Sequence, residues 1–128
     1  MDTTAKKRIL IMEDEKFLRD LYVQILKEEG YEVTEAADGE EGYRHLHEGG
    51  FDLILMDIML PKMTGLDIMK KLKDDPVLKP NGKIIFLTNL NQDIDINEGV
   101  AFGVSGCLIK SDYTPDQIIK QVKGFLIN

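Results

Sequence analysis

Five short apolar runs recur along the sequence and predict its strands. They lie at residues 9–12, 31–36, 53–56, 84–87 and 107–109, and each has about the length of a β-strand. The segments between the runs carry apolar residues at helical spacing, most clearly in the stretch before Gly30. Because strands alternate with helices, the pattern predicts an α/β domain in which a parallel sheet is covered on both faces.

Polar residues mark the starts of the predicted helices. Asp38 and Thr64 are typical N-caps of the second and third helices. The stretch TPDQ at residues 114–117 combines an N-cap, a proline at the first helical position and a capping-box partner. The fourth predicted helix, at residues 91–102, contains Gly99 and several β-branched and acidic residues. Its low helix propensity makes this helix a candidate for mobility.

The apolar runs also differ in pattern, which predicts their order in the sheet. The runs at 9–12, 53–56 and 84–87 are continuously apolar, as in central strands, whereas polar and apolar residues alternate at 31–36, as in an edge strand. Right-handed crossovers then favour a doubly wound five-stranded parallel sheet of order 2-1-3-4-5, a single (βα)5 domain. The 128 residues fit one such domain, spanning 1–128.

Composition and charge exclude several classes of function. The formal net charge of −7 argues against nucleic acid as a direct partner. No apolar run approaches the roughly 20 residues of a membrane-spanning helix, so no membrane insertion is expected. The N-terminal apolar run is too short for a signal peptide, and the single cysteine, Cys107, cannot form an internal disulfide; both features suit a cytoplasmic protein.

Polar side chains stand at the ends of four predicted strands. Glu13 and Asp14 follow the first strand, Asp57 the third, Thr88 the fourth and Lys110 the fifth. Because the carboxyl ends of parallel strands share one edge of the sheet, these residues are expected to meet in one pocket beside the switch point between the first and third strands. Asp57 interrupts the otherwise apolar FDLILMDIML, so its carboxylate needs a cation or water beside it.

The three carboxylates predict a bound cation. At a separation of about 5 Å and an effective dielectric near 20, each pair would repel by about 3 kcal/mol. Either one carboxyl group stays protonated or a divalent cation binds, and oxygen ligands favour Mg²⁺, with Mn²⁺ or Ca²⁺ as substitutes. A carboxylate beside such a cation, an ammonium and a hydroxyl suits phosphoryl transfer, with Asp57 as nucleophile and Lys110 and Thr88 beside it.

The same stretches carry a resemblance to a known family. ILIMEDE, DLILMDIMLPKMTGLDIM, IIFLTN and CLIK occur in order along the chain, which over nearly its full length resembles the CheY-like receiver domains of response regulators in two-component signalling, a family with a flavodoxin-like fold. The resemblance implies that a sensor histidine kinase or histidine phosphotransfer protein donates a phosphoryl group to Asp57, which Thr88 and Lys110 then contact. The metal ligands that it implies are Glu13, Asp14, Asp57 and the backbone carbonyl of Met59.

The resemblance implies a signalling domain and not a turnover enzyme. Such a domain catalyses only its own phosphorylation and dephosphorylation, and phosphorylation changes the surface that binds a downstream protein. No output domain is expected within the chain. The alternative is a degenerate receiver that acts as a phosphorylation-independent interaction module. A Mg²⁺-dependent phosphatase is less favoured, because MDIMLP offers no second acid two residues after Asp57 to protonate a leaving group.

The chain departs from the family's pattern at two positions near the fifth strand. Ser111 follows Lys110, whereas the family usually has a proline at this position, joined to the lysine by a cis peptide bond. A cis bond before a residue other than proline is costly, so a trans bond is predicted here. Cys107 stands where the family commonly has tyrosine or phenylalanine. We therefore expect the response to phosphorylation to involve the fourth helix and its preceding loop. The switch candidates are Thr88, Asn89, Leu90 and Cys107.

Two apolar residues occupy positions that the resemblance places beside the phosphoryl group. Met59 and Leu90 lie two residues beyond Asp57 and Thr88 respectively, and apolar side chains cannot orient an attacking water. Slow self-dephosphorylation is therefore predicted. Asn89, where the family often has alanine, adds bulk at the entrance and is predicted to restrict small phosphodonors.

Overall fold

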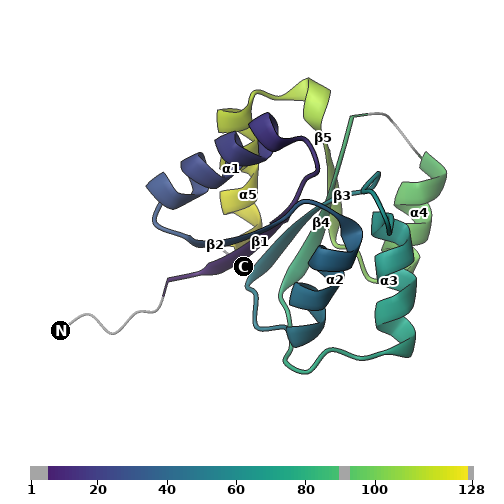
Figure 1. Ribbon diagram of the computed structural model, residues 1–128. Helices are drawn as coiled ribbons and strands as arrows, with labels where there is room; N and C mark the ends of the chain where they lie inside the picture. Colours follow the sequence, from purple (N-terminus) through teal and green to yellow (C-terminus); the bar gives the residue numbers. More distant parts are fainter. Residues whose placement is uncertain (1–5, 90–92, 127–128) are drawn as a thin grey trace.

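Five strands form one parallel sheet in the computed structural model, which describes residues 6–89 and 93–126 (Figure 1). The strands are β1 (Arg8–Met12), β2 (Glu32–Ala36), β3 (Leu53–Asp57), β4 (Lys83–Thr88) and β5 (Gly106–Ile109). Their order is β2-β1-β3-β4-β5, and every neighbouring pair is parallel. Both the predicted strand order and the predicted edge position of the second strand are confirmed.

Helices cover both faces of this sheet. They are α1 (Lys16–Glu28), α2 (Gly39–Glu48), α3 (Gly65–Asp74), α4 (Asp93–Ala101) and α5 (Pro115–Leu126), with a short 3₁₀ helix η1 (Lys110–Asp112) before α5. Helices α1 and α5 lie on one face, and α2, α3 and α4 lie on the other (Figure 1). The doubly wound α/β fold of the flavodoxin-like class is thus confirmed. None of the helices in the described ranges is long and apolar enough to span a membrane.

Each face of the sheet buries its own apolar cluster, because successive side chains of a strand point to opposite faces. On β1, Ile9 and Ile11 pack toward α1 and α5, whereas Leu10 and Met12 pack toward α2 and α3. All four side chains are fully buried. The continuously apolar pattern of the central strands follows from this two-sided burial.

Side-chain caps start the helices where the sequence predicts them. Asp38, Thr64 and Thr114 each accept a hydrogen bond from the backbone N–H three residues on, at 2.8, 3.1 and 3.3 Å. Such bonds satisfy N–H groups that have no partner within the helix. At the other end of α1, Gly30 has a φ of 94°, in the left-handed region that favours glycine. Thr64 and Thr114 begin the helices that follow Asp57 and Lys110, so they end the loops that these two residues begin.

Gly99 of α4 lies directly against the ring of Phe86 on β4. A Cβ atom at residue 99 would lie 2.3 Å from Phe86 Cε2, and Phe86 is fully buried. Gly99→Ala is expected to lower the free energy of unfolding by about 1 kcal/mol, because overpacking outweighs the gain in helix propensity. The matched control is Gly124→Ala in α5, where a Cβ meets nothing within 4 Å and stability should rise. Urea denaturation measures both, and a stabilised Gly99→Ala variant would contradict the tight contact.

Candidate functional site

One pocket lies where the carboxyl ends of β1, β3, β4 and β5 meet. Its volume is about 400 Å³. The residues that line it are Glu13, Asp14, Glu15, Leu18, Asp57, Met59, Thr88, Asn89 and Lys110. All five polar residues predicted at the strand ends are therefore brought together, as the topology required.

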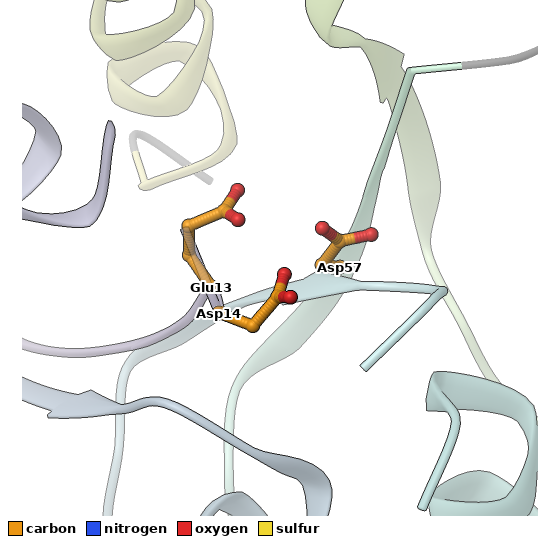
Figure 2. A group of neighbouring side chains, drawn as sticks. All are labelled: Glu13, Asp14 and Asp57. Carbon is orange, nitrogen blue, oxygen red and sulfur yellow. The ribbon is translucent and has the colours of Figure 1, made fainter. Parts of the chain in front are cut away.

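Glu13, Asp14 and Asp57 form a carboxylate cluster in this pocket (Figure 2). Each contributes one oxygen, and these oxygens lie within 4.8 Å of one another. Glu13 and Asp57 are buried, whereas Asp14 is exposed. The separation matches the value of about 5 Å at which mutual repulsion requires a compensating charge. Three carboxylates at this spacing are a suitable ligand set for a hard divalent cation.

Lys110 places its ammonium group between two of the acids. The residue is only 7% exposed, and its Nζ donates hydrogen bonds to Asp57 Oδ2 at 2.8 Å and to Glu13 Oε1. Burial by itself lowers the pKa of Lys110, but the hydrogen bonds to Asp57 and Glu13 outweigh burial, so the pKa is raised. Lys110 therefore remains charged and is the cation that a carboxylate at the end of β3 requires.

Both oxygens of the Glu13 carboxylate accept hydrogen bonds. Besides the bond from Lys110, the carboxylate accepts a hydrogen bond from the backbone N–H of Glu15 at 3.1 Å. Burial raises the pKa of the Glu13 carboxyl; the bonds from Lys110 and Glu15 oppose this rise, and the nearby charge of Asp57 adds to it. Glu13 therefore binds a proton more readily than an exposed glutamate does.

Asp57 is the last residue of β3, and its orientation is set by the loop that follows. Its Oδ1 accepts a hydrogen bond from the backbone N–H of Met59 at 3.1 Å, while Oδ2 is bound by Lys110. The loop folds back because the N–H of Gly65 donates to the carbonyl of Ile58 at 2.7 Å. Both oxygens of the acid are thus held by hydrogen bonds in the pocket.

The four residues predicted to take part in a switch do not all lie at the pocket. Thr88 is buried at the end of β4 and Asn89 is exposed, and both line the pocket. Cys107 lies elsewhere: it is paired with Phe86 across the sheet and packs with the cluster beneath α3 and α4. Leu90 lies outside the described residues. The roles of these four residues in a switch stay a prediction.

The peptide bond after Lys110 is trans, as predicted, since the described part of the chain contains no cis peptide bond. Lys110 nevertheless reaches the acids, because it lies at the end of β5 and begins η1.

Glu15 is a lining residue that the sequence analysis missed. Its carboxylate caps α1 by accepting hydrogen bonds from the N–H groups of Phe17 and Leu18, at 3.2 and 2.8 Å. The signal in the sequence is an acid directly before the first helical residue, which is a typical N-cap position. By starting α1 at this point, Glu15 sets the connection that carries Glu13 and Asp14.

The family comparison agrees with this geometry. The family described as response regulator receiver domain matches residues 9–123. Transcriptional regulatory protein DltR of Streptococcus agalactiae is 34% identical over 116 residues, which cover 91% of this chain and 50% of that protein. Alkaline phosphatase synthesis transcriptional regulatory protein PhoP of Bacillus subtilis is 32% identical over 120 residues, covering 94% and 48%. The chain thus spans about half the length of these curated relatives.

Solved structures share the fold over nearly the whole chain. A response regulator receiver domain protein (CheY-like) from Methanospirillum hungatei JF-1 has a TM-score of 0.82 and 32% identity, covering 95% of this chain and 94% of that one. Chemotaxis protein CheY4 of Vibrio cholerae has a TM-score of 0.79 and 29% identity, covering 95% and 100%. With the family match extending over residues 9–123, the chain belongs to the response regulator receiver domain family.

Proposed function

We propose that this receiver domain takes a phosphoryl group onto Asp57 from a sensor histidine kinase or a histidine phosphotransfer protein, in a Mg²⁺-dependent reaction. Phosphorylation then changes the surface that binds a downstream protein. The observation that carries the proposal is the carboxylate of Asp57, oriented in the pocket by hydrogen bonds from Met59 N–H and Lys110 Nζ and lying beside two further acids. Family membership supports a role in two-component signalling.

In the proposed transfer, an oxygen of Asp57 attacks the phosphorus of a phosphohistidine in line with the leaving nitrogen. The new phosphorus–oxygen bond makes an acyl phosphate. The phosphorus–nitrogen bond breaks, its electron pair returns to the imidazole, and a proton from water keeps the ring neutral. Lys110, whose pKa is raised, offsets charge on the phosphoryl oxygens, and the hydroxyl of Thr88 donates a hydrogen bond to one of them.

The chemistry of the acidic cluster fits Mg²⁺. Three carboxylates with oxygens within 4.8 Å are hard ligands, and Mn²⁺ or Ca²⁺ would substitute. The residues that would hold the ion are Glu13, Asp14, Asp57 and, through its backbone carbonyl, Met59. When bound, the ion supplies positive charge beside the phosphoryl oxygens.

Residues 1–128 act as one receiver domain in the cytoplasm, where a kinase or phosphotransfer protein supplies the phosphoryl group. The domain promotes only its own phosphorylation and dephosphorylation and turns over no separate substrate.

Intact mass spectrometry tests the proposal. After incubation with Mg²⁺ and acetyl phosphate, the protein should gain one phosphoryl group, and a metal chelator should prevent the gain. Because Asn89 lines the pocket and is predicted to restrict small donors, a negative result is followed by a phosphorylated histidine-kinase domain as donor. No gain from either donor, together with no Mg²⁺ binding, would leave the phosphorylation-independent interaction module as the better interpretation.

As the pH is lowered, Mg²⁺ binding is expected to begin to weaken at a higher pH than it would with carboxylates of ordinary pKa. The cation binds deprotonated carboxylates, and burial raises the pKa of Glu13, so Glu13 begins to take up a competing proton at higher pH. Calorimetric titration with Mg²⁺ between about pH 5 and pH 7 measures the effect. Glu13→Gln is the control, and its weaker binding should depend less on pH; equal pH dependence in both proteins contradicts the prediction.

Met59→Asn is expected to shorten the lifetime of the phosphorylated protein by about tenfold, because an amide can orient the attacking water and a thioether cannot. Met59 is 58% exposed and lines the pocket two residues after Asp57. Loss of the phosphoryl mass with time, after removal of the donor, gives the lifetime. The control is Leu78→Asn, an apolar residue 72% exposed outside this pocket. A Met59→Asn lifetime equal to that of wild type would count against the prediction.

A further inference from the structure

Arg19 lies outside the pocket but contacts the backbone that carries two of its acids. From the first turns of α1, its Nη1 donates a hydrogen bond to the carbonyl oxygen of Glu13 at 2.8 Å. Its Nε donates to the carboxylate of Glu35 on β2 at 3.0 Å. The Arg19 side chain is only 13% exposed. The guanidinium is therefore held between the β1–α1 connection and the edge strand.

The bond from Arg19 acts on Asp14 through the peptide unit that joins Glu13 to Asp14. A peptide unit is planar, so the carbonyl oxygen of Glu13 and the Cα of Asp14 lie in one plane. The preceding N–H, that of Glu13, donates to the carbonyl of Ala36 at 3.1 Å. With both backbone groups of Glu13 bonded, the peptide unit that leads into Asp14 is held in place, which limits the directions in which Asp14 can project from the end of β1.

Asp14 needs this support more than the other two acids do. Within the described part of the chain, its carboxylate has no hydrogen bond or ion pair, whereas Glu13 and Asp57 are both bound by Lys110. Its nearest oxygen lies within 4.8 Å of those two negative groups, and repulsion favours its turning away. The position of the cluster's third acid therefore depends more on the backbone than that of the other two does.

We propose that Arg19 is a positioning residue for the cation site. By holding the carbonyl of Glu13 it keeps Asp14 directed at Asp57, and Glu35 in turn orients Arg19. Arginine suits this role because its planar guanidinium binds two acceptors in a fixed geometry, which the ammonium of lysine does not. The inference rests on the proposed function in one respect, namely that the cluster binds Mg²⁺.

Positioning and charge predict opposite effects of removing Arg19. The guanidinium is a positive charge near a cation site, so Coulomb repulsion alone predicts tighter Mg²⁺ binding in Arg19→Gln. Positioning predicts weaker binding instead, by about tenfold, as is typical when a group that orients metal ligands is lost. Arg19→Lys keeps the charge but loses the two-acceptor geometry, and it should also bind Mg²⁺ more weakly.

Isothermal titration of Mg²⁺ into wild type and variants is the test. The matched control is Arg44→Gln on α2, which makes the same charge change at an exposed residue outside the pocket and should bind as wild type does. Arg19→Lys keeps the charge, so it carries the test if Arg19→Gln fails to fold. Glu35→Gln leaves Arg19 in place and should weaken binding by a smaller factor, but it also removes a negative charge, which alone predicts weaker binding.

The outcomes separate this inference from the proposed function. Weaker Mg²⁺ binding in Arg19→Gln and Arg19→Lys, with Arg44→Gln unchanged, supports the positioning role. Unchanged or tighter binding in the Arg19 variants overturns that role and leaves the proposed function standing, provided that wild type binds Mg²⁺. Absence of Mg²⁺ binding by wild type overturns both the cation site and the role of Arg19.

Discussion

Asp57→Asn is expected to abolish Mg²⁺-dependent phosphoryl uptake. The amide has nearly the same shape as the carboxylate but is a poor nucleophile, and losing a nucleophile reduces a reaction rate by a thousandfold or more. Glu13 has the same kind of hydrogen-bond partners, Lys110 and a backbone N–H, but it is more deeply buried, at 1% exposed against 7% for Asp57, and Asp14 is exposed. Intact mass after incubation with Mg²⁺ and a phosphodonor should show one phosphoryl group on wild type and none on the variant.

The Asp57→Asn variant should still fold, so that its loss of phosphoryl uptake reflects the missing nucleophile and not unfolding. Lys110 keeps its ion pair with Glu13, and the substitution removes the charge of Asp57 that opposes ionisation of Glu13. Thermal unfolding should therefore give a melting temperature close to that of wild type. Asp74→Asn, an exposed acid at the end of α3, is the matched control and should take up phosphate normally. Uptake that persists in Asp57→Asn would place the acceptor on another residue.

The order of the strands could be predicted because burial leaves a pattern in the sequence. The alternating run of β2 and the continuous runs of β1, β3 and β4 distinguish an edge strand from buried ones. Strand ends are less predictable: β3 extends to Asp57, which pairs with Leu87, although the apolar run ends at Met56. Backbone hydrogen bonding does not depend on side-chain polarity, so a ladder can continue past the last apolar residue.

That the site residues meet in one place could also be predicted, but the contacts among their side chains could not. Topology alone brings Glu13, Asp57 and Lys110 to one edge of the sheet. Which acids the ammonium contacts depends on side-chain conformation, and the structure shows that it binds two acids at once. Nothing in the sequence pattern indicated a role for Arg19, because only the fold brings its partners Glu13 and Glu35 close to it.

Lys110→Met is expected to make the stability of the protein depend on Mg²⁺. Removing the ammonium leaves the carboxylates of Glu13 and Asp57 buried without their shared cation, and breaking a buried pair in this way costs about 3 kcal/mol. A divalent cation on the same carboxylates restores the missing charge, and a ligand that binds only the folded state stabilises it. The melting temperature should fall without Mg²⁺ and rise with added Mg²⁺ by more than that of wild type.

The same variant separates two effects of the lysine charge. Without a positive charge in the cluster, Mg²⁺ should bind about tenfold more tightly, since electrostatic competition near a partly exposed pocket amounts to about 1–2 kcal/mol after solvent screening. Phosphoryl uptake should slow, because Lys110 no longer offsets charge on the phosphoryl oxygens. Lys120→Met, at an exposed position on α5, is the control and should change neither quantity. Wild-type Mg²⁺ affinity together with wild-type uptake in Lys110→Met would refute the role assigned to this ammonium, because both effects depend on the same charge.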